Sequence, residues 1–288
     1  MTILVISNWH ERPDLLLQQV ENYNIAFDGD LIHYVNISAN FAESFERSRV
    51  RAGIDFAKIG NLHFLDPAVP TKWGKVAHAY FQAVLKALAD GRRFDYVYFH
   101  TPADLIIKRG VAHHIRNYDF GLGKSWRMQA TFETRDGQEF IDTETTPAFR
   151  DAIRADPTLA PMLRTLGMDS LYKSRSEGCF FRTDLFFEIM YPLLAHKSLV
   201  DMRDMEMVYP IEEYLIAVCV EFFCKERKLR RARHVVLTSK TQNQIATEAE
   251  MQDVLADPQL FGIKRFAPAL DDPLRAHARQ LLTGSVAA

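Results

Sequence analysis

The chain of 288 residues contains few cysteines, and their spacing argues against two common uses of this residue. Only Cys179, Cys219 and Cys224 occur, and no two of them form a C-x-x-C pair, so neither a zinc knuckle nor a disulfide framework is indicated. Cys219 and Cys224 fall in an apolar helical stretch, which is typical of cysteines buried as small hydrophobic residues. The sequence therefore predicts structural thiols in a reducing compartment.

A strong excess of one charge and a long apolar run are also missing. Lys and Arg number 35 against 37 Asp and Glu, a formal net charge of -2, which argues against nucleic acid as the main partner. No run of 18 apolar residues appears, and the apolar N-terminal run is too short for a signal peptide and has no basic start. With 48% hydrophobic and 25% charged residues, we expect a globular cytoplasmic protein with a substantial core.

Motifs that hold phosphate or a divalent metal ion are missing as well. No Walker loop and no GxGxxG follows an apolar strand-like run. The only Asp-x-Asp, at residues 28–30, precedes a predicted strand, whereas a metal held against a diphosphate needs it after a strand. His113 and His114 are adjacent, which is a poor spacing for a metal pair on a helix. The sequence predicts neither a metal site nor a bound cofactor.

Apolar runs alternate with helical patterns in the first third of the chain. Runs at 3–7, 31–37 and 96–100 predict strands, and a helical pattern follows Pro13 and recurs at 75–89. A β-α-β start favours a parallel sheet, so the expected class is α/β with a mostly parallel central sheet.

The middle and the end of the chain are less regular. A hairpin is expected around an Asp136-Gly137 turn. Residues 147–166, interrupted by two prolines, predict a helical insert or a flexible lid. Strands are expected at 178–182 and 235–238, and a final helical stretch is expected from about Thr247.

Two adjacent carboxylates stand at the start of an apolar helical stretch. Residues 209–215 read YPIEEYL, with Glu212 and Glu213 just after Pro210, a residue suited to the first helical turn. The positive end of the helix dipole stabilises an ionised carboxylate, and a general base must be ionised. Acidic residues also gather in first turns for stability alone. From the residues themselves, the pair is either a stabilised helix start or a catalytic base.

Isolated polar residues elsewhere offer further candidates, each with an ordinary alternative. Residues 261–264, FGIK, predict a Gly-containing bend that carries Lys264; like Lys240, it is either a surface lysine or a cation for a diphosphate. Asp104 follows a strand end, where ligands bind in α/β sheets, and would otherwise cap a local turn. Glu133 lies in a strand expected near the mouth of the sheet, where it would contact an acceptor.

The one dense basic run lies at residues 225–234, KERKLRRARH. Such a run complements the dipole at a helix end. The alternative is a patch from Lys225 to His234 that meets a lipid-linked or anionic acceptor at the inner membrane surface.

Five segments, taken in order, resemble motifs of one enzyme family. Residues 73–76 resemble its WGG segment, 98–104 its strand ending LSGQD, 177–181 its GSx(W/Y)F strand, 212–215 its DE(Y/F) motif and 260–266 its LFAxKF segment. The family is that of the core-2/I-branching β-1,6-N-acetylglucosaminyltransferases, which includes the peptide O-xylosyltransferases. The disulfides and the membrane anchor of its secreted members are absent, and Ala103 replaces the glutamine of LSGQD.

The resemblance implies a GT-A-type fold and an inverting transfer without a metal ion. It assigns the base to Glu213 and a diphosphate contact to Lys264. The second cation of the family is an arginine, for which Lys240 is the nearest candidate by position. Asp104 and Glu212 are then expected to contact the donor sugar or the acceptor.

The expected organisation is one glycosyltransferase domain over residues 1–288. Residues 1–120 form a nucleotide-sugar-binding half, residues 121–245 an acceptor and catalytic half, and residues 246–288 a C-terminal helical extension with the phosphate-contacting lysine. The expected partners are a UDP-sugar, with GlcNAc or xylose, and a glycan or glycolipid acceptor. The alternatives are a transferase with another donor that acts in capsule or lipopolysaccharide synthesis, and a non-catalytic nucleotide-sugar or glycan-binding protein.

Overall fold

The computed structural model describes residues 1–206, 208–238 and 244–284. Its centre is a seven-stranded sheet in the order β11-β6-β10-β4-β1-β2-β3. The β1–β2, β1–β4, β2–β3 and β6–β11 pairs are parallel, while β10 runs antiparallel to both of its neighbours. This confirms the α/β class with a mostly parallel central sheet. The strands are β1 (Thr2–Trp9), β2 (Asp30–Ile37), β3 (Leu62–Phe64), β4 (Tyr96–His100), β6 (Phe120–Gly121), β10 (Phe180–Arg182) and β11 (Arg231–Ala232).

Helices cover both faces of this sheet because the central strand β1 has apolar side chains on both faces. Ile3 and Val5 of β1 pack in one hydrophobic cluster with Tyr23 of α1 (Pro13–Ala26). Leu4 and Ile6 pack in another cluster, which includes α3 (Ala77–Ala89). Because successive side chains of a strand point to opposite faces, a strand that is apolar at every position is buried on both sides.

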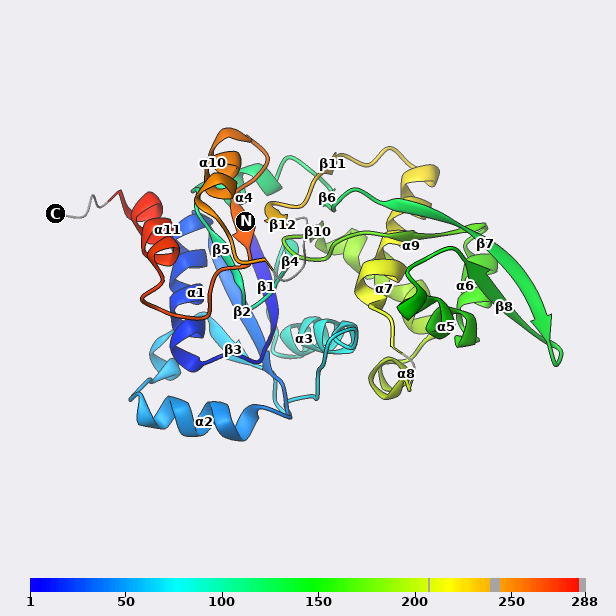
Figure 1. Cartoon of the computed structure of the whole chain (residues 1–288), viewed down its shortest axis with the longest axis horizontal. Coiled ribbons are helices and arrows are strands. Elements are labelled where there is room, and N and C mark those ends of the chain that lie inside the picture. The colour runs from blue at the N-terminus through cyan, green and yellow to red at the C-terminus, as the bar shows by residue number, and fades with distance from the viewer. Residues whose placement is uncertain (207, 239–243, 285–288) are drawn as a thin grey trace.

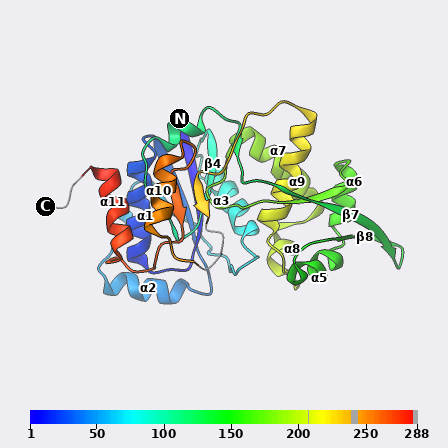
Figure 2. The same ribbon diagram turned by 45° about the horizontal axis from the view of Figure 1, so that its top comes forward.

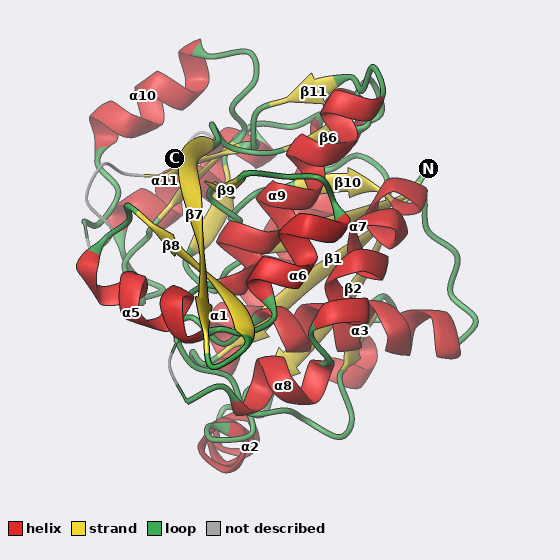
Figure 3. Ribbon diagram, turned by 90° about the vertical axis from the view of Figure 1, so that its right-hand side faces the viewer, coloured by secondary structure: helices red, strands yellow, loops and turns green. Residues whose placement is uncertain are grey.

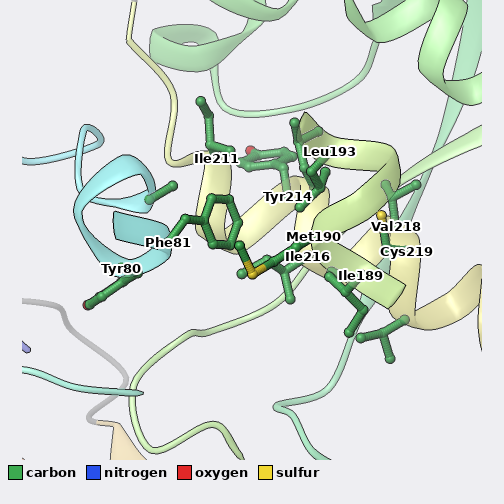
Figure 4. Close-up of a cluster of buried hydrophobic side chains, with 14 of the residues drawn as sticks. Tyr80, Phe81, Ile189, Met190, Leu193, Ile211, Tyr214, Ile216, Val218 and Cys219 are labelled. Carbon is green, nitrogen blue, oxygen red and sulfur yellow. The ribbon is translucent and has the colours of Figure 1, made fainter. Parts of the chain in front are cut away.

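The second cluster continues into the helices beyond the sheet (Figure 4). Phe81 of α3 lies with Ile189 of α7 (Thr183–His196) and with Ile216 and Cys219 of α9 (Ile211–Glu226). Cys179 and Cys219 are buried and Cys224 is half-buried, and all three are free cysteines. This agrees with the predicted structural thiols.

The predicted hairpin is present and is longer than expected. Strand β7 (Trp126–Arg135) pairs with β8 (Gln138–Thr143) on one side and with β9 (Ser170–Lys173) on the other. Asp136 and Gly137 both have positive φ, 50° and 79°, as a tight two-residue hairpin turn requires. The hairpin projects from the side of the molecule opposite α1 (Figures 1 and 3).

Residues 147–166 form the helical insert that the sequence predicted as one alternative, rather than a flexible lid. This segment forms α5 (Pro147–Ala155) and α6 (Leu159–Thr165), and both helices pack on β8. Ile153 and Leu163 are fully buried, so hydrophobic packing fixes the segment. Pro157 lies between the helices, and Pro161 lies in the first turn of α6, where no backbone N–H is needed.

The C-terminal extension packs beside α1 (Figure 2). A small sheet in the order β12-β13-β5 joins this extension to the strand that follows β4. The predicted bend at Lys264 is wrong, since Lys264 ends strand β13 and lies opposite Asp104 of β5. The bounds are β5 (Asp104–Ile106), β12 (Val236–Thr238), β13 (Gly262–Lys264), α10 (Glu248–Ala256) and α11 (Pro273–Thr283).

Three further helices complete the architecture, and the sequence patterns did not predict them. They are α2 (Ala42–Arg51), α4 (Val111–Ile115) and α8 (Leu199–Asp204), with a 3-10 turn at Phe56–Lys58. In the part of the chain that the structure describes, every helix is too short or too polar to cross a bilayer.

Candidate active site

A cleft of about 700 Å³ lies at the carboxyl ends of β1 and β4. Asn8 and His10, at the end of β1, line it together with Thr101, which follows β4. Ligands of open α/β sheets bind outside the carboxyl ends of the strands, where the loops diverge. The cleft is therefore where this architecture favours a ligand.

The start of α9 forms one wall of the cleft, and a buried ion pair fixes it in place. Pro210 caps the helix, and Glu212 and Glu213 in its first turn both line the cleft. The hydroxyl of Tyr209, just before the cap, donates to Asp156 Oδ2 at 2.7 Å. The ammonium of Lys197 donates to the same oxygen at 2.7 Å. This fully enclosed pair anchors the chain where the two glutamates begin.

A loop after β3 packs against the same wall. Lys72 and Lys75 form an isolated antiparallel bridge, and Gly74 between them has a φ of +73°. A Cβ atom on Gly74 would lie 2.5 Å from Val208 Cγ1, so glycine allows both the turn and the close approach. The neighbouring Trp73 is 65% exposed, lines the cleft and stacks on Phe149 at 5.3 Å.

Glu213 lies between two cations. Its carboxylate is 3.7 Å from Lys173 Nζ and 3.9 Å from Arg175 Nη1. The pKa of Glu213 is raised above its usual value, chiefly by burial and then by the charge of Glu177, while Lys173, Arg175 and Lys264 limit the rise. The two nearby cations favour the ionised form that a base needs.

Glu212 differs from Glu213 in its surroundings. It is 7% exposed, and its Oε2 has no hydrogen-bond partner among the described residues. Burial, followed by the charges of Glu213 and Glu177, raises the pKa of Glu212 to about 8. At neutral pH the Glu212 carboxyl is therefore mostly protonated and can donate a hydrogen bond.

Lys264 reaches the cleft from β13 and forms an ion pair with Glu177. Glu177 precedes Gly178, whose φ of +72° lets the backbone pass close to Val236 of β12. Burial raises the pKa of Glu177, but the charge and hydrogen bond of Lys264 outweigh it, so the pKa lies below its usual value. The second carboxylate oxygen, Oε2, is buried without a partner in the described part of the chain.

Asp104 lies behind the cleft wall and is fully buried. Its two oxygens accept from the Thr101 amide at 2.9 Å and the Thr101 hydroxyl at 2.7 Å. Burial raises the pKa of Asp104 to about 6, against the effects of Lys264 and Thr101. The observed geometry is that of the turn cap, and this turn supports residues 101–103, which line the cleft.

Two other candidates do not join this group. Glu133 lies in the β7–β8 hairpin and pairs with Arg135 at 2.8 Å and Arg154 at 3.7 Å, away from the residues that line the cleft. Lys240 lies outside the residues that the structure describes, so its expected phosphate contact stays a prediction. The Asp-x-Asp at 28–30 is exposed in the turn before β2, at the far end of that strand from the cleft.

The basic run at 225–234 is largely matched by acidic partners. Its arginines pair with acidic residues from separate elements: Arg227 with Glu188, Arg230 with Asp119, Arg231 with Glu221 and Arg233 with Asp257. Its outward charge is therefore lower than the sequence indicates, and contact with a membrane stays a prediction.

The structure adds three residues to the site to which the sequence assigned no role: Trp73, Arg175 and Glu177. Trp73 and Glu177 begin two of the segments that resemble family motifs. Glu177 and Arg175 fall in an irregular stretch between β9 and β10, where no period marks them. The unusual signal in the sequence is an acidic residue directly before Gly178 and an apolar strand.

The chain matches no protein-family model and no curated protein. Among solved structures it is similar to a nucleoside-diphosphate-sugar pyrophosphorylase from Vibrio cholerae RC9, with 11% identity, a TM-score of 0.41, and 81% of this chain and 91% of that chain covered. It is also similar to the galactosyltransferase LgtC in complex with donor and acceptor sugar analogs, with 10% identity, a TM-score of 0.39, and coverage of 100% and 97%.

A third similar structure is 4-diphosphocytidyl-2C-methyl-D-erythritol synthase from Anaerococcus prevotii, with 12% identity, a TM-score of 0.41, and coverage of 88% and 95%. At these TM-scores the likenesses carry no argument about activity.

Proposed function

We propose that the protein is a GT-A-type glycosyltransferase that moves a sugar from a UDP-sugar to a glycan hydroxyl with inversion. The observation that carries the proposal is that Glu213 and Lys264, from distant parts of the chain, line one cleft at the carboxyl ends of the parallel strands. Glu213 supplies the base, and Lys264 supplies a cation for the leaving diphosphate.

In the proposed reaction Glu213 takes the proton of the acceptor hydroxyl. The hydroxyl oxygen forms a bond to the anomeric carbon on the face opposite the diphosphate. The bond from that carbon to the diphosphate oxygen breaks, and UDP leaves with the electron pair. Lys264 stabilises the charge that develops on the diphosphate, with Lys240 as the expected second cation.

The surroundings of the two glutamates support Glu213 as the base. Burial raises the pKa of both carboxyls, but Lys173 and Arg175 lie within 3.9 Å of Glu213 and limit the rise there. The pKa of Glu212 is raised to about 8. A base must be ionised before it acts. A mostly protonated Glu212 suits another task, which is to hydrogen-bond a hydroxyl or ring oxygen of the donor sugar or the acceptor. We propose GlcNAc or xylose as the transferred sugar, by the resemblance given above.

We propose that the transfer needs no metal ion and no bound cofactor. The basis is the position of the only Asp-x-Asp, which is exposed at the wrong end of β2 for a diphosphate-bound metal. The test is turnover after treatment with EDTA. Activity that is abolished by EDTA and restored by Mn²⁺ or Mg²⁺ overturns this part of the proposal.

The central experiment compares Glu213→Gln with Glu133→Gln, a matched change in the exposed hairpin pair. UDP release from UDP-GlcNAc and UDP-xylose is measured with and without glycan acceptors, and UDP binding is measured by calorimetry. We expect turnover of Glu213→Gln to fall by about 10²- to 10⁴-fold with UDP binding retained, while Glu133→Gln stays within about twofold.

Near wild-type turnover of Glu213→Gln removes the base assignment. A wild-type protein that binds UDP but releases none from any UDP-sugar is a non-catalytic binder. Selective turnover of a different nucleotide sugar identifies a transferase of another donor class.

A further inference from the structure

A second cleft lies beside the first, and the two share part of their lining. It has a volume of about 900 Å³ and is formed by the loop between β6 and β7, by β11 with the residues that follow it, and by side chains of β9 and α9. Arg175 and Thr238 line both clefts. Because Arg175 Nη1 is 3.9 Å from Glu213 Oε1, the second cleft begins next to the proposed base.

The charged lining of this second cleft is mostly cationic. Its lining holds one carboxylate, Glu221, and four cations: Lys124, Arg175, Arg231 and Arg233. Two carboxylates outside the lining reduce this excess, since Asp257 pairs with Arg233 and Glu213 lies 3.9 Å from Arg175. His234 also lines it, but burial lowers the pKa of its imidazole to about 4, so it adds no charge at neutral pH. A concave surface with this excess attracts anions and concentrates them near the site.

The cations are placed in a way that leaves donors for a ligand. Arg231 is held rigidly, since it donates to Glu221 Oε1 at 3.0 Å and to the carbonyl of Gly123 at 3.0 Å. Arg233 uses Nη1 for Asp257 at 2.8 Å, and a guanidinium has five N–H donors in all. Lys124 is exposed and has no partner among the described residues. A fixed guanidinium binds carboxylate or phosphate with little loss of side-chain entropy.

The cleft also has an aromatic platform. Trp126, the first residue of β7, is 48% exposed and lines the cleft together with the nearly buried Tyr172 of β9. Exposed tryptophan beside fixed polar groups is the composition of a site for a ligand with flat apolar faces and polar edges. A sugar ring has this character.

We propose that the second cleft binds the acceptor, and that the acceptor is an oligosaccharide that carries anionic groups, either carboxylate or phosphate. Its terminal sugar reaches Glu213, and its chain passes Arg175 and lies on Trp126, with its charges at Lys124, Arg231 and Arg233. The assignment of this glycan as the acceptor rests on the proposed transferase function. Binding of the anionic glycan is measurable without any transfer.

The test measures binding to wild-type protein by calorimetry and by quenching of tryptophan emission. Hexagalacturonic acid supplies carboxylates, maltohexaose bearing phosphate monoesters supplies phosphates, and unmodified maltohexaose is the neutral control. We expect at least one acidic hexamer to bind about tenfold or more tightly than maltohexaose, and to bind more weakly as salt rises. The stronger of the two acidic probes identifies the source of the charge.

Variants locate the site. Trp126→Ala, and the double variant Lys124→Ala with Arg233→Ala, are each expected to weaken binding of the acidic hexamer by about tenfold or more. Arg127→Ala is the matched control, because Arg127 is an exposed neighbour of Trp126 that pairs with Asp169 and does not line the cleft. Circular dichroism checks that each variant is folded.

The proposal is overturned if maltohexaose binds as tightly as both acidic hexamers, or if Arg127→Ala weakens binding as much as the double variant. It is also overturned if vesicles of phosphatidylcholine with phosphatidylglycerol bind at the same residues more tightly than either hexamer. UDP binding, measured in parallel, separates the two hypotheses. If the wild-type protein does not bind UDP, the transferase proposal is wrong. Whether the second cleft binds an acidic oligosaccharide is decided by the hexamer measurements alone.

Discussion

Carboxylates gather in two regions of this molecule, and their surroundings differ. On the β7–β8 hairpin Glu133, Glu139 and Asp142 each pair with an arginine from the hairpin, α5 or α6. In the cleft, Glu177 and Glu212 are less than 10% exposed and each has an oxygen without a partner among the described residues. The hairpin pairs satisfy one another, while the cleft carboxylates lack partners that a ligand would supply.

The difference separates two kinds of charged site. Exposed pairs add little to stability, because water already solvates both groups. A buried polar atom without a partner costs free energy on folding, and native proteins keep few of them. Groups retained at such a cost are expected where a ligand completes their hydrogen bonds.

The largest expected effect tests whether a buried, paired carboxylate contributes more to stability than an exposed, paired one. Asp156 is buried but fully paired, with Lys197 and Tyr209 on one oxygen. Asp156→Ala leaves the ammonium of Lys197 buried without its counter-charge, so we expect the free energy of unfolding to fall by about 3–5 kcal/mol. Denaturant titration measures it, and Glu139→Ala on the hairpin, which breaks a more exposed pair with Arg164, is expected to cost about 1 kcal/mol or less. Equal losses in the two variants contradict the distinction.

The second test compares two variants in the cleft that are expected to change UDP affinity in opposite directions. Lys264 forms an ion pair with Glu177, so removing the lysine should weaken diphosphate binding, whereas removing the charge of Glu177 should strengthen it. We expect Lys264→Ala to weaken UDP binding by about 10- to 100-fold, the worth of a hydrogen bond to a charged group. Glu177→Gln is expected to strengthen UDP binding, because the ammonium loses its internal partner.

Calorimetry with UDP gives both values. The exposed pair of Arg164 and Glu139 on the other side of the molecule provides the matched controls. Arg164→Ala and Glu139→Gln are expected to leave the affinity unchanged. A Glu177→Gln variant that binds UDP more weakly than the wild type argues against Lys264 as the diphosphate contact.

The third test concerns the pH dependence of stability. Burial raises the folded-state pKa of Glu212 to about 8, above the usual value of 4.5. The native state therefore binds more protons than the unfolded state between these values, and stability that is present below pH 4.5 is lost as pH rises through about 8. We expect Glu212→Gln to remove most of this loss, which the two pKa values put at about 4 kcal/mol between pH 5 and pH 9.

Denaturant titration at pH 5, 7 and 9 measures the difference between wild type and variant. Glu133→Gln is the control, because its carboxyl is paired on the surface. A difference between wild type and Glu212→Gln that stays constant across this range contradicts the raised pKa.

The sequence predicts much of the fold because the governing signals are local. The strand predicted from the apolar run at Ile3 to Ile6 and the Asp136-Gly137 turn depend only on neighbouring residues, and both are confirmed. The strand at Lys264 was missed because it is three residues long and exists only through pairing with β5 and β12. Neither partner is near it in the sequence.

The same limit applies to the candidate site. Glu212, Glu213 and Lys264 follow from motifs, and the structure places all three around one cleft. Glu177 was missed because its position depends on the turn at Gly178 and on a partner from β13. Glu133 was placed near the sheet's mouth, but the long β7–β8 hairpin carries it outward, to where Arg135 and Arg154 neutralise it.

The pairing of Tyr209, Lys197 and Asp156 has a consequence for how the protein opens. Asp156 follows α5, Lys197 follows α7 and Tyr209 precedes α9, so one carboxylate oxygen ties together three chain segments. None of the three segments can separate without exposing the other two, and they are expected to exchange their amide hydrogens as one cooperative unit. The amide hydrogens at the start of α9 are then expected to exchange as slowly as those of the rest of that unit. Glu212 and Glu213 would keep their positions while the surrounding loops fluctuate faster.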